Sequence, residues 1–185
     1  MIIRTLAPFL CLAVAACSIR PSPDTAVLPF AAFGTMDNDV AAANQAAWAF
    51  AAPERIANNP VDAARAAAAI DYLAGELASN PRWLMISPLT KKEMVQARID
   101  VRQVLAIAPN TPSQVVVNAL MRFGSEWQAG NQTGAIQALA APGFTPPPEQ
   151  TLRVLSNLPY IRSANLAAID AANQMLPGGM ARSRP

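Results

Sequence analysis

A long helix is predicted by the stretch PVDAARAAAAIDYLAGELAS, which occupies residues 60–79. The pair Asn59-Pro60 supplies an N-cap and a proline at the first helical position, and Asn80-Pro81 ends the pattern. Apolar side chains recur on one stripe of this helix and polar side chains on another; the apolar set is Ala66, Ile70, Leu73 and Leu77, and the polar set is Asp62, Arg65, Tyr72 and Glu76. The stretch therefore predicts an amphipathic helix that packs against other helices.

The same alanine-rich periodicity, punctuated by proline, continues through residues 37–177. Helices are expected over residues 39–52, 60–79, 87–108, 132–140 and 161–176, with two more that start near residues 111 and 145. Short connections between helices favour antiparallel neighbours. We therefore predict an all-α fold, a compact bundle of about six or seven short antiparallel helices in one domain.

The N-terminus carries a targeting pattern. A short basic segment, Met1–Arg4, is followed by the apolar segment Leu6–Ala16. A membrane-spanning helix needs about 20 apolar residues, so this segment has the length of a cleaved signal. Its last residues, Val14-Ala15-Ala16, run directly into Cys17, and the junction resembles the lipobox of bacterial lipoproteins. The resemblance implies that residues 1–16 are a signal peptide and that the mature chain begins at Cys17, which carries lipid.

The lipoprotein resemblance also implies a location. Acyl chains on Cys17, palmitate among them, would anchor the protein to one leaflet, because each buried methylene contributes about 0.8 kcal/mol. Ser18 follows the cysteine, and in Gram-negative members of the family a residue other than aspartate there permits export to the outer membrane. The expected location is the periplasmic face of the outer membrane. The alternative is an ordinary secretory signal with a chance cysteine.

Three segments follow the predicted signal. Residues 17–36 hold the lipidated cysteine and a proline-rich stretch, and we expect them to form a tether. Residues 37–177 are the expected helical domain. Residues 178–185 are predicted to be a disordered tail.

The composition argues against several kinds of chemistry. The chain has no histidine, which removes the usual general base and the commonest metal ligand. Cys11 lies in the signal and Cys17 would carry lipid, so the mature chain has no free thiol. We therefore predict no catalytic residue, no metal and no cofactor. The net charge of +2 becomes +1 without Arg4, 13 basic against 12 acidic side chains, which argues against a nucleic-acid partner.

Two partial resemblances to enzyme sites lack the required pattern. Ser87 and Lys91 lie one helical turn apart, but penicillin-binding proteins place lysine three residues after serine, where Thr90 stands. A glycosidase needs two carboxylates about 5 to 9.5 Å apart. The available carboxylates are Asp71, Glu76, Asp100 and Glu126, and the sequence brings no two of them together.

Three basic residues share one face of the helix expected at 87–108. Lys91, Arg98 and Arg102 follow one another at spacings of seven and four, so they fall in a narrow angular band. Such a strip can contact a phosphate, a lipid headgroup, a glycan carboxylate or a partner. The alternative is a solvated flank beside the apolar stripe.

A short apolar run lies between two helices. Trp83-Leu84-Met85-Ile86 stands between Pro81 and Pro88 and shows no polar alternation. It is a candidate contact patch for a partner. The alternative is a connector that is buried across the helices.

One segment resembles the turn and second helix of a tetratricopeptide repeat. Gly130-Asn131 begins it, and Ala135, Ile136 and Leu139 occupy the family's apolar positions. The resemblance covers residues 130–139 only, and no second copy lies 34 residues to either side. It implies a helical hairpin.

The anchor and the absence of recognisable chemistry favour one function. We expect a lipid-anchored periplasmic accessory or adaptor protein, attached to the membrane through Cys17, that binds a partner protein or an envelope component. The first alternative is a small-molecule or lipid-binding domain with a pocket between helices. The second is a cell-wall hydrolase with two clustered carboxylates.

Overall fold

Prolines and small polar residues set the ends of most helices, as the sequence pattern predicts. The computed structural model describes residues 23–34 and 37–176. In these residues the chain forms seven α-helices and two short 3-10 helices. The elements are α1 (Asn38–Ala51), η1 (Pro53–Arg55), α2 (Pro60–Ser79), η2 (Pro81–Trp83), α3 (Pro88–Val104), α4 (Ser113–Gln128), α5 (Gln132–Ala138), α6 (Pro148–Ser156) and α7 (Arg162–Met175).

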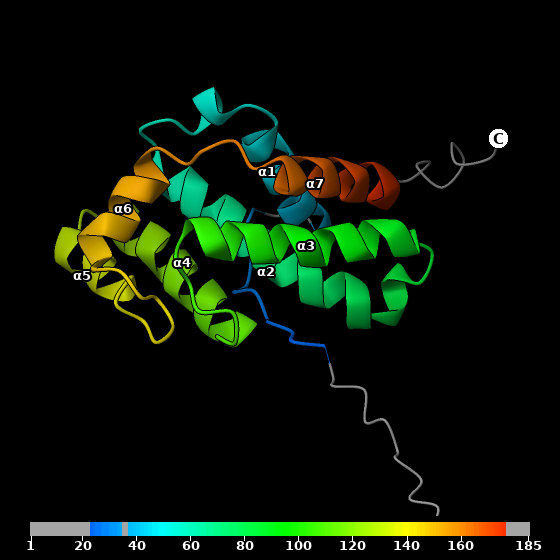
Figure 1. Cartoon of the computed structure of the whole chain (residues 1–185), viewed down its shortest axis with the longest axis horizontal. Coiled ribbons are helices and arrows are strands. Elements are labelled where there is room, and N and C mark those ends of the chain that lie inside the picture. Colours follow the sequence, from blue (N-terminus) through cyan, green and yellow to red (C-terminus); the bar gives the residue numbers. More distant parts are fainter. Residues whose placement is uncertain (1–22, 35–36, 177–185) are drawn as a thin grey trace, which may run out of the picture.

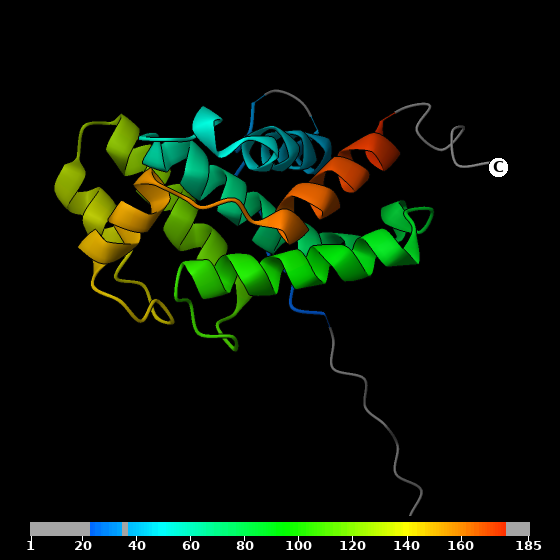
Figure 2. The ribbon, with the colours of Figure 1, turned by 45° about the horizontal axis from the view of Figure 1, so that its top comes forward.

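The helices pack as an all-α bundle, and the predicted fold class is confirmed (Figure 1). The long helix α2 packs against α1, α3, α4 and α6. Helix α7 packs against both α1 and α3, and it lies between them in Figure 2. Helices α4, α5 and α6 gather at one end of the molecule.

Helix α2 is more deeply buried than its predicted two-stripe pattern allows. Every residue from 66 to 75 is buried, including the polar side chains of Asp71 and Tyr72. The expected polar stripe is therefore wrong at Tyr72, because α1, α3, α4 and α6 together surround the helix. The alanines make this possible, since small side chains let helix axes approach closely.

Helix α3 ends earlier than the expected boundary at residue 108. Its last residue is Val104, and Ala106 then adopts a left-handed conformation with φ of 51°. Ile107 forms an isolated β-bridge with Phe144, and the Thr145 hydroxyl donates a 2.7 Å hydrogen bond to the Ala106 carbonyl. This contact between two loops also explains why α6 begins at Pro148 and not near residue 145.

The expected tether is partly a component of the domain. Residues 24–34 lie along the bundle, and the side chains of Ala26, Leu28 and Ala32 are buried in the core. The predicted boundary at residue 37 is therefore too late, because the sequence around Pro29 carries no helical period but still buries apolar side chains. The signal segment, Cys17 and the tail at 178–185 lie outside the described residues.

The segment that resembles a tetratricopeptide hairpin forms part of a helix pair. Helices α4 and α5 pack together, and Gly130 turns the chain between them with φ of 77°. The side-chain oxygen of Asn131 caps α5 by accepting a 3.0 Å hydrogen bond from the Gly134 amide. Within residues 23–34 and 37–176, no helix is both long enough and apolar enough to cross a membrane.

Candidate functional site

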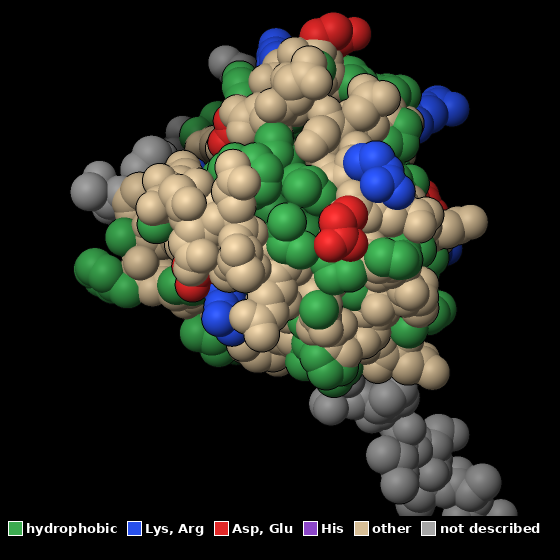
Figure 3. All heavy atoms as spheres, turned by 90° about the vertical axis from the view of Figure 1, so that its left-hand side faces the viewer, with side chains coloured by type: hydrophobic (Ala, Val, Ile, Leu, Met, Phe, Trp, Pro, Cys, Tyr) green, Lys and Arg blue, Asp and Glu red, His purple; other side chains and the backbone are tan. Residues whose placement is uncertain are grey.

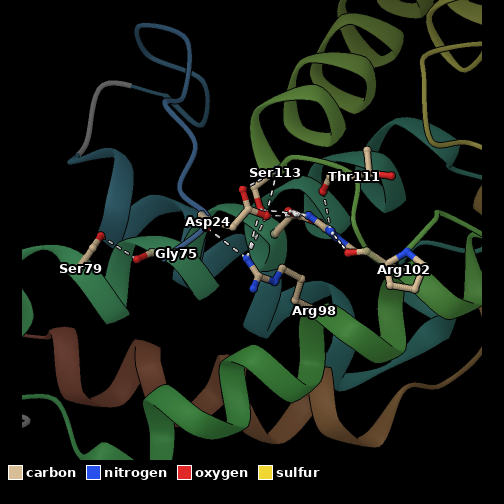
Figure 4. A network of polar contacts seen from close by, with 9 residues as sticks. Asp24, Gly75, Ser79, Arg98, Arg102, Thr111 and Ser113 are labelled. Atoms are coloured by element: carbon tan, nitrogen blue, oxygen red, sulfur yellow. Dashed lines mark hydrogen bonds and ion pairs between the residues drawn. The ribbon is translucent and has the colours of Figure 1, made fainter. Parts of the chain in front are cut away.

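A polar network joins the N-terminal segment to α3 and α4 (Figure 4). The carboxylate of Asp24 accepts hydrogen bonds from the Ser113 amide at 2.9 and 3.1 Å and from its hydroxyl at 2.8 Å. Ser113 is the first residue of α4, so the Asp24 carboxylate lies at the positive end of that helix. The amide is one that the helix itself leaves without a partner.

Two guanidinium groups complete the surroundings of Asp24. The Nη1 of Arg98 lies 3.6 Å and the Nη2 of Arg102 lies 3.5 Å from its Oδ2. Partial burial opposes ionisation of Asp24, but the hydrogen bonds from Ser113 and the two positive charges outweigh it. The pKa of Asp24 is therefore lowered from its ordinary value of 3.8.

Arg102 does not lie on an exposed cationic strip. Its side chain is buried and forms a two-pronged pair with Asp71 of α2, with Nε–Oδ2 and Nη2–Oδ1 both at 2.7 Å. Its Nη1 donates to the carbonyl oxygens of Pro109 and Thr111 at 3.0 and 2.8 Å. Burial opposes the charge, but the hydrogen bonds and charge of Asp71 outweigh it, so the pKa of Arg102 is raised. The spacing correctly places Arg98 and Arg102 on one face of α3. Near the C-terminal end of α3, however, that face points into the bundle, where Arg102 is buried.

The other two members of the predicted strip have different surroundings. Arg98 is partly buried, and its Nη1 donates to the Asp24 carbonyl at 3.2 Å and to the Ser113 hydroxyl at 3.1 Å. Lys91 is half-buried near the start of α3. The structure therefore brings Arg98 and Arg102 together around Asp24, and it leaves Lys91 two turns away on the same helix.

Backbone contacts hold the rest of the N-terminal segment. The amide of Val27 donates to the Gln114 side chain at 2.7 Å, and that side chain donates back to the Val27 carbonyl at 3.0 Å. Gly75 lets the segment cross α2 closely, because a Cβ atom at that position would lie 2.8 Å from the Thr25 Cα and would collide with the Asp24 carbonyl. Sequence reasoning missed this docking. The available signal was Gly75 itself, a glycine inside an alanine-rich helix.

The apolar run at 83–86 is divided by the structure into two buried and two exposed side chains. Trp83 and Ile86 are buried, whereas Leu84 and Met85 are 74% and 76% exposed. The predicted buried connector is therefore correct at Trp83 and Ile86 only, and partner contact at this run stays a prediction. The run also presents an apolar pair to the surroundings of the protein.

A second polar network fixes this loop. The buried carboxylate of Asp39 accepts hydrogen bonds from the Trp83 indole at 3.0 Å and from the Tyr72 hydroxyl. Arg82 pairs with Asp37 and Asp39, and its guanidinium lies 4.5 Å from the centre of the Trp83 ring. Burial and the contact with Asp39 raise the pKa of Tyr72, and the hydrogen bond to Asp37 raises the pKa of Arg82. The loop is thus held from its first residues.

The far side of the loop is fixed to the last turn of α7. The Ser87 amide donates to the Gln174 side chain at 2.8 Å, and that side chain donates to the Thr90 hydroxyl at 2.8 Å. The Ser87 hydroxyl accepts from the Leu89 amide and caps α3. Ser87 is therefore a capping residue in the structure, and Leu84 and Met85 project from a loop that is anchored at both ends.

The carboxylates that an enzyme would need each have another partner. Asp71 pairs with Arg102, and Asp100 accepts from Gln96 and Ser163. Glu126 accepts from Asn131, and Glu76 accepts from Asn80. The described residues contain no group of three or more histidine, cysteine or acidic side chains arranged to hold a metal.

A cleft of about 960 Å³ lies beside Asp24. Arg98, Ile99 and Gln103 of α3 line one part of it, and residues 106–110 with Thr145 line another. The volume is that of a small-molecule site. The guanidinium of Arg102, which reaches its edge, is already occupied by Asp71 and two carbonyl groups.

The end of the molecule that carries α5 and α6 has mixed chemistry. Figure 3 shows the end that carries α5 and α6, where single basic and acidic side chains are interspersed among hydrophobic ones. No field of one sign covers this described face, in keeping with the nearly balanced charge of the sequence. The chain matches no protein-family model, no curated protein and no solved structure.

Proposed function

We propose that the protein is a lipid-anchored accessory protein of the periplasm, which is attached to the outer membrane through Cys17 and binds a partner protein or an envelope component near the leaflet. One observation carries the proposal. The lipobox-like junction at Cys17 is followed, after only six residues, by Asp24, which is bonded into the folded domain.

Because Asp24 is bonded to the domain, only a short stretch of chain separates the proposed anchor at Cys17 from the folded part. A chain advances at most about 3.6 Å per residue, so Cys17 lies no more than about 25 Å from Asp24. A free tether that ended at residue 36 would be more than twice as long. A lipid on Cys17 would therefore hold the domain close to the membrane and limit how it turns.

The exposed loop supports a binding role. Leu84 and Met85 are large apolar side chains that a loop fixed on both sides presents to solvent. A rigid loop loses little conformational entropy when a partner covers it. The carboxylates of Asp71, Asp100 and Glu126 are each engaged with a different partner side chain.

Lipid attachment is tested by two cysteine variants in cells that are fed an alkyne-labelled fatty acid. Cys17→Ser should abolish labelling and release the protein from the outer-membrane fraction. Cys11→Ser is the matched control, because it removes the other cysteine of the N-terminal segment and should leave labelling unchanged. Equal labelling of both variants, or none in the unsubstituted protein, would reject the anchor.

Partner binding is tested by photo-crosslinking in living cells. A crosslinking amino acid at position 85, 92 or 160 samples the exposed loop, the start of α3 and the connection before α7. Capture of one dominant protein or envelope component, dependent on Cys17, supports an accessory role. If nothing is captured and the detergent-solubilised protein migrates alone, the proposal fails.

The cleft beside Asp24 favours a second candidate function, the binding of a small apolar molecule. Native mass spectrometry of the purified protein tests it. An added mass that is lost when Gln103→Trp narrows the cleft would support this function. A single mass equal to that of the chain and its lipid would count against it.

A further inference from the structure

Three exposed apolar side chains lie where α2 passes into α3. Leu84 and Met85 follow η2, and Leu89, which is 62% exposed, lies in the first turn of α3. Isolated exposed leucines are common on protein surfaces, but three within six residues form a local apolar patch. We name Leu84, Met85 and Leu89 the apolar knob.

The apolar knob is built rigidly. Trp83 beneath it is buried and bonded to Asp39, and Ile86 is buried as well. Ser87 is bonded to Gln174 of α7. A loop with this many anchors cannot turn its exposed leucine and methionine inward without breaking buried hydrogen bonds, which is costly. The exposure of Leu84 and Met85 is therefore a fixed property of the fold.

Two lysines lie beside the apolar knob, near the N-terminal end of α3, where a positive charge is unfavourable. Lys91 and Lys92 lie in the opening turns of α3, whose positive dipole end disfavours cations, and the first turn contains no acidic residue. Among residues 23–34 and 37–176, no carboxylate forms an ion pair with either lysine. Their positions therefore lower helix stability, and an external anion would reverse that effect.

Leucine and lysine share one face here. Lys92 follows Leu89 by three residues, so the two side chains are neighbours on the surface of α3, and both are exposed. An apolar side chain flanked by lysines is the pattern of a surface that enters the headgroup region of a bilayer. A protein pocket would also accept the apolar knob, but it would need carboxylates placed opposite both lysines.

The knob lies at the same end of α2 as the start of the described chain. Asp24 and Thr25 contact α2 at Gly75, one turn before that helix ends at Ser79. Leu84 follows Ser79 by five residues, which places it within about 25 Å of Gly75. The chain from Cys17 to Asp24 has the same reach, so an anchor on Cys17 can bring the knob to the membrane surface.

We propose that the apolar knob, with Lys91 and Lys92, rests on the anionic surface of the leaflet that holds the Cys17 anchor. This inference rests on the proposed function, because the anchor supplies the local concentration that three side chains alone do not. The envelope component that this loop contacts is then the lipid of the leaflet itself. The three apolar side chains enter the headgroup boundary, and the two lysines contact lipid phosphates.

Membrane contact by the apolar knob can be tested independently of lipid attachment in cells. A chain that starts at Cys17 keeps every described helix, and Cys17 is its single thiol, so it can be coupled to a maleimide lipid in vesicles. An environment-sensitive fluorescent amino acid at position 85 reports contact with lipid, and the same amino acid at position 160 is the control. On vesicles of phosphatidylethanolamine and phosphatidylglycerol, we expect a blue shift and quenching by brominated acyl chains at position 85 only.

Three double variants are compared by the same fluorescence signal at position 85. With the probe kept at position 85, Leu84→Ser with Leu89→Ser should lower the equilibrium constant for the lipid-contacting state about tenfold or more. Tyr160→Ser with Leu166→Ser, which removes two exposed apolar side chains elsewhere, should leave it unchanged. Lys91→Gln with Lys92→Gln should abolish the preference for phosphatidylglycerol over phosphatidylcholine vesicles.

Water-like emission at position 85 in the coupled chain would overturn the inference, and so would dominant capture of a protein from position 85 in cells. Neither result would contradict the proposed lipid anchor, which is tested separately by fatty-acid labelling of Cys17. If the unsubstituted protein is not labelled in cells, the proposed function is rejected, even if the apolar knob of the lipid-coupled chain contacts vesicles.

Discussion

Asp71 and Arg102 form a buried, two-pronged ion pair that joins the central helix α2 to α3. The remaining donors of Arg102 reach the carbonyl groups of Pro109 and Thr111 and the hydroxyl of Ser113. One guanidinium thus fixes α2, the end of α3, the following loop and the start of α4. Removing one member of such a pair is far more damaging than replacing both, because a lone buried charge remains.

Arg102→Met should lower the free energy of unfolding by about 3 to 5 kcal/mol, since it leaves the Asp71 carboxylate buried without its partner. Asp71→Leu combined with Arg102→Met should cost less than Arg102→Met alone. Urea denaturation of the single and double variants measures the coupling. Losses that simply add would show that the two side chains do not act as a pair.

Gly75→Ala should release the N-terminal segment from α2. The new methyl group would meet the backbone of Asp24 and Thr25, and the cost should exceed the gain of up to about 1 kcal/mol in helix propensity. Gly124→Ala is the matched control, because its methyl group would lie 3.5 Å from the Val61 side chain, an ordinary contact. Hydrogen exchange should rise at residues 24–28 in Gly75→Ala alone. Equal protection in both variants would contradict the docking.

Acid should weaken the contacts that the Asp24 carboxylate makes with Ser113, Arg98 and Arg102. Its pKa is lower in the folded state than the ordinary value of 3.8, so its stabilising contribution is complete above that value and is lost as pH falls through the folded pKa. The stability difference between the unsubstituted protein and Asp24→Asn should therefore shrink below about pH 4. Urea midpoints at stepwise pH measure it, with Asp170→Asn on the exposed face of α7 as the control. A difference that is constant with pH would contradict the assignment.

Asp39→Ala should loosen the loop at 81–86. It leaves the Tyr72 hydroxyl and the Trp83 indole without their acceptor, at a cost of about 2 to 4 kcal/mol. Asp39→Asn keeps one acceptor oxygen and should cost less. Hydrogen exchange at the Trp83 and Ile86 amides should increase in Asp39→Ala more than in Asp39→Asn. Unchanged exchange in both would show that Asp39 does not hold the loop.

Local signals were sufficient to predict most helices. Asn59-Pro60 acts within a single turn, so its capping role is visible in sequence and is found in the structure. The docking of Asp24 depends on Ser113, which is 89 residues away in sequence. No local period records such a contact. The spacing of Arg98 and Arg102 defined a helix face, but whether that face is exposed depends on which helix packs against it.

The route of the chain at Asp24 also determines how the protein would bear a mechanical load. In a chain anchored through Cys17, a pull from the membrane reaches Asp24 before it reaches any helix of the part that the structure describes. The bonds of Asp24 to Ser113 and the paired bonds between Val27 and Gln114 would then be strained one after another, from the membrane side inward. Because α2, α3 and α4 meet at this point, the load would be shared by the centre of the bundle, and α1 would be protected from unravelling first.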